Sequence, residues 1–227
     1  MRRAACALAL TLAAAAALFA PAAVSRAIDL RDIPTVVVDA GHGGEDGGVT
    51  GRLTGVKESD LNLAVALVLG EYLESAGMRV VYTRVNADAL TSGEFDKRRD
   101  MHLRAEIIAR AAPDAVVSIH MNTFPDHSRR GAQAFYDAGD EEGARLAAAV
   151  QEMLNDDFNL PDAGRGFSAL AADKFLLRES AAPAVIVECG FLSNGEDEAA
   201  LTDPLYRARL AYTVFRAITA YLSSRGA

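Results

Sequence analysis

The sequence has 227 residues, of which 51% are hydrophobic, and a formal net charge of −8. This length and apolar content fit one globular domain with a sizeable core. The acidic balance argues against nucleic acid or an anionic lipid surface as a partner, and against simple electrostatic adhesion to an anionic polymer.

Residues 1–27 have the features of a secretory signal peptide. Arg2 and Arg3 precede an apolar, alanine-rich stretch over residues 4–19, and small residues follow, with candidate cleavage sites after Ala22 and Ala27. The apolar stretch of about 16 residues is short for a membrane span of roughly 20. We therefore expect cleavage and an extracytoplasmic protein. The alternative is an uncleaved N-terminal anchor, in which case the membrane is contacted only through this segment.

Cleavage would change both the charge and the cysteine content of the chain. The signal contains three arginines and no acidic residue, so its removal takes the net charge from −8 to −11. It would also remove Cys6 and leave Cys189 alone, which excludes an intrachain disulfide in the remaining domain, residues 28–227. Cys189 follows an apolar run, so we interpret it as a small buried residue and not as a nucleophile.

The remaining chain alternates strand and helix patterns. In chain order they predict a strand at 35–40, a helix at 59–75, a strand at 79–83, a helix at 97–111, strands at 115–120 and 132–136, and a helix at 141–158. A loop at 161–174 follows, then a strand at 184–188, a short helix from about residue 196 and a final helix at 203–223. This order predicts an α/β fold, a single domain with a mostly parallel twisted sheet and helices on both faces. No internal repeat or linker follows the signal.

Three predicted strands end in ionisable residues. The first leads into His42 within VVVDAGHGGEDGG, the third ends at His120, and the late strand ends at Glu188. In open α/β sheets ligands bind beyond the carboxyl ends of the strands, so these side chains should meet there. Glu58, just ahead of the first helix, is a fourth candidate. Its alternative role is an acid at the helix N-terminus, with Ser59 as the cap.

Two imidazoles and one carboxylate are a common catalytic zinc set, so His42, Glu58 and His120 are candidate ligands for one zinc ion per chain. Three protein ligands leave a fourth position for water. Glu188 is then free to act as the general base, because burial at the end of an apolar strand raises the pKa of a carboxyl group.

Asp39 is a candidate to orient His42 from outside the ligand set. The neighbouring glycines allow positive φ angles and leave room beside the metal. A phosphate-binding loop is disfavoured, because no Gly-Lys-Ser/Thr follows.

At these residues the sequence resembles the zinc-dependent N-acetylmuramoyl-L-alanine amidases of amidase type 3. The matching motifs occur in the family's order and cover about residues 35–222: DAGHGGEDGG, KESDLNL, SIHMN, RGAQAFY and PAVIVECGFLSN. The resemblance implies that His42, Glu58 and His120 hold zinc and that Glu188 is the catalytic acid/base. It also implies hydrolysis of the amide between the lactyl group of muramic acid and the first L-alanine of the peptidoglycan stem peptide.

Within this family the sequence is most similar to the spore-cortex, germination-specific amidases, which prepare muramic acid for conversion to the δ-lactam. This similarity implies action in the cell wall or the forespore intermembrane space. The alternatives are a general cell-wall autolysin, another zinc hydrolase such as a peptidase, and a catalytically dead peptidoglycan-binding module. The stretch 137–174 is too short for the inserted helix that blocks the site of division amidases, while activation by a partner protein stays open.

Two further residues are candidates for substrate binding. Arg178, in KFLLRES, is placed to meet a carboxylate of the stem peptide, and its alternative is a surface ion pair with Glu179 or Asp173. Asn122 follows His120 by two residues and is a candidate to line the site.

Overall fold

The computed structural model describes residues 33–91 and 94–225. The predicted signal or anchor segment, residues 1–27, lies outside this range, so its cleavage and the domain boundary at residue 28 stay predictions. None of the helices in the described ranges is long and apolar enough to cross a membrane.

In the described part of the chain, six strands form one twisted sheet in the order β2-β1-β3-β6-β4-β5. Their bounds are β1 (Thr35–Ala40), β2 (Arg79–Tyr82), β3 (Ala115–Asn122), β4 (Gln133–Tyr136), β5 (Leu170–Ala171) and β6 (Ala184–Phe191). The strands pair in parallel except for β4, which runs antiparallel to β6. The predicted α/β fold with a mostly parallel sheet is confirmed.

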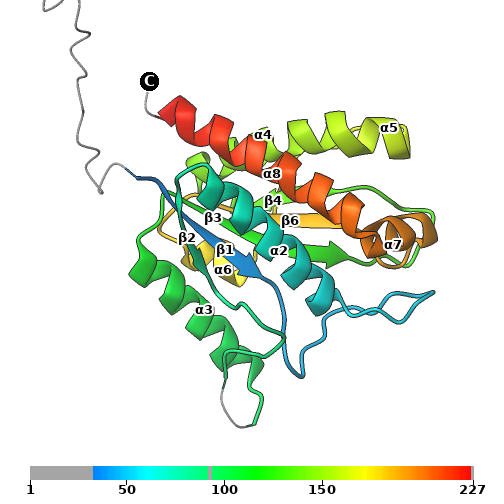
Figure 1. Ribbon diagram of the computed structural model, residues 1–227, viewed down its shortest axis with the longest axis horizontal. Coiled ribbons are helices and arrows are strands. Elements are labelled where there is room, and N and C mark those ends of the chain that lie inside the picture. The colour runs from blue at the N-terminus through cyan, green and yellow to red at the C-terminus, as the bar shows by residue number, and fades with distance from the viewer. Residues whose placement is uncertain (1–32, 92–93, 226–227) are drawn as a thin grey trace, which may run out of the picture. The chain divides into compact units, whose positions relative to one another are not determined.

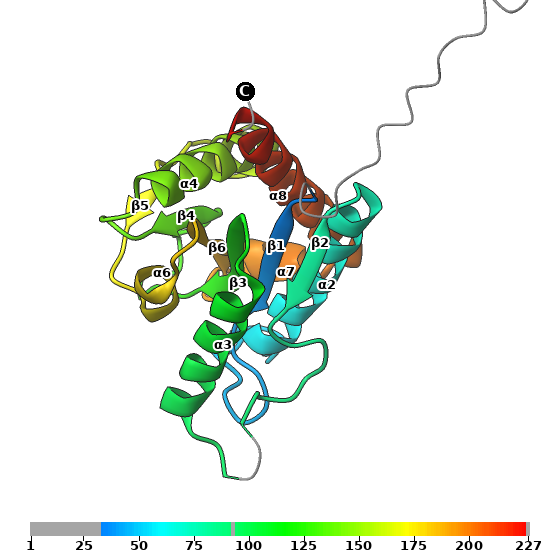
Figure 2. The ribbon, with the colours of Figure 1, turned by 90° about the vertical axis from the view of Figure 1, so that its left-hand side faces the viewer.

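Helices cover both faces of the sheet (Figures 1 and 2). One face carries α2 (Glu58–Ser75), α4 (Glu141–Leu154) and α8 (Pro204–Arg225), and the other carries α3 (Lys97–Ala111) and α6 (Phe175–Glu179). Successive β1 residues alternate between the two layers: Val36 and Val38 belong to the larger cluster of buried side chains, and Val37 to the smaller one under α3 and α6. Because strand side chains alternate in direction, a run of buried valines can serve both cores at once.

The largest difference from the predicted elements follows α4. The predicted helix at 141–158 ends at Leu154 and continues as a π-helical turn, η2 (Asn155–Asn159), and a short helix, α5 (Leu160–Ala163). Within this wider π-helical turn, the side chains of two asparagines hydrogen-bond to backbone outside the helix. Asn155 accepts from the backbone N–H of Phe167, and Asn159 accepts from that of Ala132. The predicted loop at 161–174 therefore begins with α5 and also contains β5.

Two of the three strands predicted to lead into ionisable residues, β3 and β6, extend further than predicted. β3 reaches Asn122 and β6 reaches Phe191, because the two strands keep pairing beyond His120 and Glu188. An irregularity in register lies between His120 and Asn122. The last short helix, α7 (Gly195–Thr202), is capped by Asn194, whose side chain accepts from the backbone of Glu196 and Asp197.

Candidate metal centre and active site

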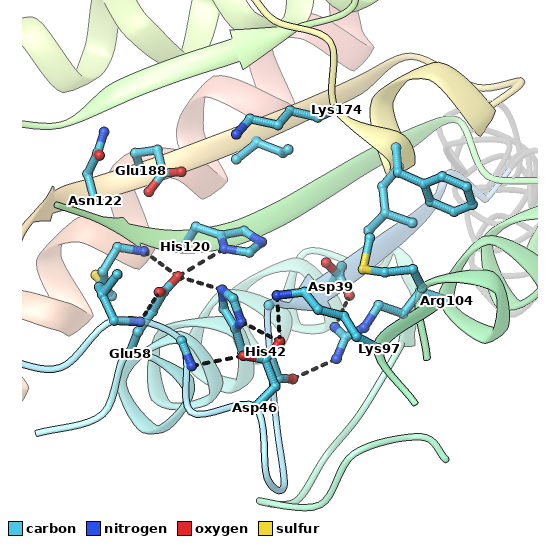
Figure 3. Close-up of a pocket in the computed structure, with 18 of the residues that line it drawn as sticks. Asp39, His42, Asp46, Glu58, Lys97, Arg104, His120, Asn122, Lys174 and Glu188 are labelled. Carbon is cyan, nitrogen blue, oxygen red and sulfur yellow. Dashed lines mark hydrogen bonds and ion pairs between the residues drawn. The ribbon is translucent and has the colours of Figure 1, made fainter. Parts of the chain in front are cut away.

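His42, Glu58 and His120 meet at one end of the sheet (Figure 3). One possible ligand atom from each lies within 4.8 Å of the others. Glu58 Oε1 is 3.2 Å from His42 Nε2 and 3.0 Å from His120 Nδ1. Imidazole nitrogens and a carboxylate oxygen are ordinary zinc ligands, and three of them leave a position for water. The residues present therefore fit a catalytic metal ion.

His42 lies in the turn after β1, and two buried arginines hold that turn. Arg104 donates to the carbonyl oxygens of Ala40 and His42 at 2.7 and 2.6 Å, and Arg84 donates to that of Gly41 at 3.0 Å. His42 has a left-handed backbone, with φ of 63°. This conformation is uncommon for a non-glycine residue, so the carbonyl contacts help to keep the ring directed at Glu58.

Two glycines make the close approach of the ligands possible. A Cβ atom at Gly41 would lie 2.2 Å from the His120 ring. A Cβ atom at Gly48, where φ is +67°, would lie 2.4 Å from Glu58 Oε2. The glycines of the GHGGEDGG turn thus leave room for the candidate ligands, as the sequence predicts.

Glu58 is the first residue of α2 and is only 2% exposed. Its Oε2 accepts from the backbone N–H of Val49, and its Oε1 accepts from that of Met121. Burial alone would raise the pKa of this carboxyl group, but the two histidines outweigh that effect and hold it well below its usual range. Glu58 is therefore ionised and directed at the imidazoles. The alternative with Ser59 as the cap is not what the structure shows, since Lys57 occupies the N-cap position.

Glu188 lies beside His120 on the neighbouring strand, at the paired position of the parallel register. Burial is the main cause of a raised pKa for its carboxyl group, and the negative charge of Glu58 adds to it. Glu188 Oε2 has no hydrogen-bond partner among the described residues. A half-buried carboxyl with a raised pKa and an unpaired oxygen, facing the candidate ligands, is suited to proton transfer.

These groups line a pocket of about 530 Å³. Asn122 also lines the pocket, and its Oδ1 accepts from the backbone of Thr123. One wall is apolar and comes from α3, α6 and β6, through Met101, Phe175, Leu176 and Ile186. Two lysines, Lys97 and Lys174, also line it. Sequence reasoning missed both, since lysines in a charged helix and a polar loop resemble ordinary surface residues.

Asp39 does not orient His42 directly. It is fully buried and accepts hydrogen bonds from Thr83, Ser118 and Arg104. Burial would raise the pKa of this carboxyl, but the Arg104 guanidinium and the two hydroxyls outweigh it and lower the pKa to about 2. Asp39 therefore reaches the His42 turn through Arg104. Sequence reasoning missed Arg104, although its spacing of four residues from Asp100, with which it pairs, is a signal of an ion pair on a helix.

Arg178 is not among the residues that line the pocket. Its guanidinium, about half exposed, pairs with Asp173 and Glu179. The structure therefore shows the surface ion pair that the sequence left as the alternative.

Comparisons with known proteins agree with this geometry. Residues 36–220 match the Amidase_3 family, described as N-acetylmuramoyl-L-alanine amidase. The chain is 30% identical over 197 residues to the germination-specific N-acetylmuramoyl-L-alanine amidase of Bacillus subtilis, covering 84% of this chain and 81% of that protein. It is also 31% identical over 218 residues to the uncharacterized protein YqiI of the same organism, covering 95% and 94% of the two chains.

Among solved structures, the CwlD amidase from Clostridioides difficile in complex with the GerS lipoprotein is similar with a TM-score of 0.78 and 33% identity, covering 84% of this chain and 99% of that one. The catalytic domain of CwlV, an amidase from Bacillus (Paenibacillus) polymyxa, gives 0.71 and 28%, covering 84% and 99%. The fold, the four strand-end and helix-start residues, and these matches together show that the chain belongs to the Amidase_3 family of peptidoglycan-hydrolysing N-acetylmuramoyl-L-alanine amidases.

Proposed function

We propose that the enzyme is a zinc hydrolase in which His42, Glu58 and His120 hold one zinc ion and Glu188 is the catalytic acid/base. The bond cleaved is the amide between the lactyl group of N-acetylmuramic acid and L-alanine of the stem peptide. One observation carries the proposal: two imidazoles and an ionised carboxylate converge beside a second carboxyl group, one oxygen of which has no partner among the described residues. This arrangement separates the metal ligands from the proton carrier.

A zinc ion bound by these three side chains would polarise the scissile carbonyl and lower the pKa of water. Glu188 supplies the proton transfers. Its carboxylate takes a proton from the attacking water while the new C–O bond forms, and it returns that proton to the alanine nitrogen as the C–N bond breaks. A raised pKa favours both transfers near neutral pH.

We further propose that this hydrolysis takes place outside the cytoplasm and serves spore-cortex maturation, leaving muramic acid ready for conversion to the δ-lactam. The similarity to a germination-specific amidase and to the CwlD amidase supports this role. The predicted signal segment supports the location. Because CwlD was solved with a lipoprotein bound, we also propose that a partner protein activates this enzyme. A general autolysin is the second candidate role.

The test uses purified protein loaded with zinc, on spore-cortex and vegetative peptidoglycan in parallel, with the products read by mass spectrometry. The proposal expects intact glycan and stem peptides with a free L-alanine amino terminus. Cleavage inside the peptide would instead identify a peptidase. Faster release from cortex than from vegetative wall supports the spore role, and equal rates support the autolysin.

Two variants assign the roles of the residues. Glu188→Gln should retain zinc and lose at least about 10²-fold in kcat, the usual size of a general acid–base contribution. His42→Ala should lose zinc, as read by elemental analysis. Near wild-type turnover by the first variant, or unchanged zinc content in the second, would refute the assignment. Absence of any product from the wild type would instead favour a dead binding module.

A further inference from the structure

Lys174 is a pocket lysine without a counter-ion. It is exposed, it precedes α6, and no carboxylate of the described residues lies within ion-pair distance of its ammonium group. The other pocket lysine, Lys97, is engaged by Asp46 at 3.1 Å. The acidic neighbour of Lys174, Asp173, is engaged by Arg178. Arg104, which also lines the pocket, pairs with Asp39 and Asp100, so among the described residues Lys174 is the pocket cation left available to a ligand.

The position of Lys174 is set by the core. It is the N-cap residue of α6, and the next residues of that helix include Leu176 and Leu177, which are 5% and 2% exposed. Figure 3 shows the lysine side chain directed into the pocket, on the side of Glu188. A ligand whose scissile bond lies between Glu188 and the candidate metal ligands would thus present one of its flanks to this ammonium group.

The charge of the whole chain makes this local cation informative. The net charge of −8 repels an anionic ligand at long range, so recognition of a carboxylate requires a local positive group. The stem peptide presents such a carboxylate close to the bond cleaved. Its second residue, D-glutamate, is linked onward through its side chain and has a free α-carboxylate, unless the cell amidates it to D-isoglutamine. Successive Cα atoms are about 3.8 Å apart, so this group lies within about two residue lengths of the scissile carbonyl.

We propose that Lys174 is a specificity-determining residue that binds the free α-carboxylate of the second stem-peptide residue, and so favours peptides in which this residue is not amidated. The inference rests on the proposed amidase function and adds a substrate preference to it. A charge-assisted hydrogen bond from an ammonium to a carboxylate is stronger than the same bond to a neutral amide. An ammonium group has no acceptor with which to bind the amide nitrogen of D-isoglutamine.

A different role for Lys174 makes a different prediction. Its positive charge lowers the pKa of Glu188, against the larger effect of burial. If this were its only role, its removal would change kcat and the pH profile equally for every substrate. Binding of the carboxylate instead changes KM for one substrate and not for the other.

The experiment compares two soluble substrates, N-acetylmuramoyl-L-alanyl-D-glutamate and N-acetylmuramoyl-L-alanyl-D-isoglutamine, with zinc-loaded wild type and Lys174→Gln. We expect KM for the glutamate substrate to rise about tenfold in the variant, the size of one hydrogen bond to a charged group. KM for the isoglutamine substrate should change less than about twofold. Any change in kcat that follows from loss of the Lys174 charge beside Glu188 should be the same for both substrates, since the bond to the carboxylate is made before and during the reaction alike.

Two controls accompany the variant. Lys174→Arg keeps the charge and should restore most of the preference. Arg110→Gln removes the same charge from an exposed position of α3, paired with Glu106 and outside the pocket lining, and should leave KM unchanged for both substrates. A rise in KM with Arg110→Gln equal to that with Lys174→Gln would show a long-range charge effect and overturn the inference.

The remaining outcomes are distinct from one another. If KM changes equally for the two substrates in Lys174→Gln, or changes for neither, the role of Lys174 is overturned while the amidase function stays intact. Wild-type protein that cleaves neither substrate nor peptidoglycan would overturn the proposed function itself. Unchanged zinc content and thermal midpoint in Lys174→Gln confirm that the variant is folded.

Discussion

Replacing Asp39 by asparagine tests the buried ion pair that supports the His42 turn. Asparagine has nearly the shape of aspartic acid but no charge, so it stands in for the protonated carboxyl. The pKa of Asp39 is lowered from 3.8 to about 2 in the folded protein. A lowering of this size corresponds to roughly 2–3 kcal/mol of stability at neutral pH.

The sign follows from the direction of the shift. Because the folded state binds this proton more weakly than the unfolded state, the contribution is fully present above about pH 5 and is lost as the pH falls toward 2. At pH 3 about half of it remains. The difference in unfolding free energy between wild type and Asp39→Asn should therefore shrink by about 1 kcal/mol between pH 6 and pH 3.

Urea unfolding followed by circular dichroism, at several pH values in this window, measures that difference directly. Arg104, which loses Asp39 and keeps Asp100 as its ion-pair partner, adds a loss that does not depend on the titration of Asp39, so the change with pH is the informative quantity. A difference that stays constant from pH 6 to pH 3 would refute the reasoning. Asp114→Asn is a matched control, since among the described residues that carboxylate accepts a single hydrogen bond, from the backbone of Thr35.

Two further substitutions test how the ligands are held. Gly41→Ala places a Cβ atom 2.2 Å from the His120 ring, so the ring must move. We expect a loss of about 1–3 kcal/mol in stability, measured by thermal unfolding, and weaker zinc binding, measured by metal titration. An unchanged zinc affinity would contradict the steric argument. Glu198→Gln loosens the loop ahead of the candidate ligand Glu58, because the buried Glu198 carboxylate accepts from the backbone of Leu53 and Thr54. We expect zinc affinity to fall about tenfold, as for other groups that support ligands, and equal affinity in a competition titration would show that the loop does not position the ligand.

Much of the fold and the site follows from local pattern. Apolar runs such as residues 115–120 and 184–188 predict buried strands wherever they occur, and helical spacing of apolar residues predicts the intervening helices. Parallel strands bring their carboxyl ends to one edge. The meeting of His42, His120 and Glu188 therefore follows from strand prediction alone, and Glu58 from its place at the start of the next helix.

Other features depend on contacts between distant parts of the chain. Asp39 and Arg104 are 65 residues apart, and their buried pairing requires the α3 helix to lie over β1. In the sequence Arg104 is one of several charged residues in a helix. Its spacing from Asp100 signals an ion pair but not burial, since the exposed pair of Arg110 and Glu106 has the same spacing. The π-turn after α4 likewise depends on bonds from its asparagines to the backbone of Phe167 and Ala132.

The contrast between Arg178 and Lys174 shows the same limit at the site. Both are cations in one short stretch, and the sequence analysis offers Arg178 as a candidate to meet a carboxylate, with a surface ion pair as the alternative. In the folded chain Arg178 pairs with Asp173, while Lys174 lines the pocket. Sequence alone determined which residues are candidates for the chemistry, because strand ends and residue types are local properties. Only the tertiary structure decided which charges are buried, paired or free, because the free energy of a charge depends on all the groups that surround it.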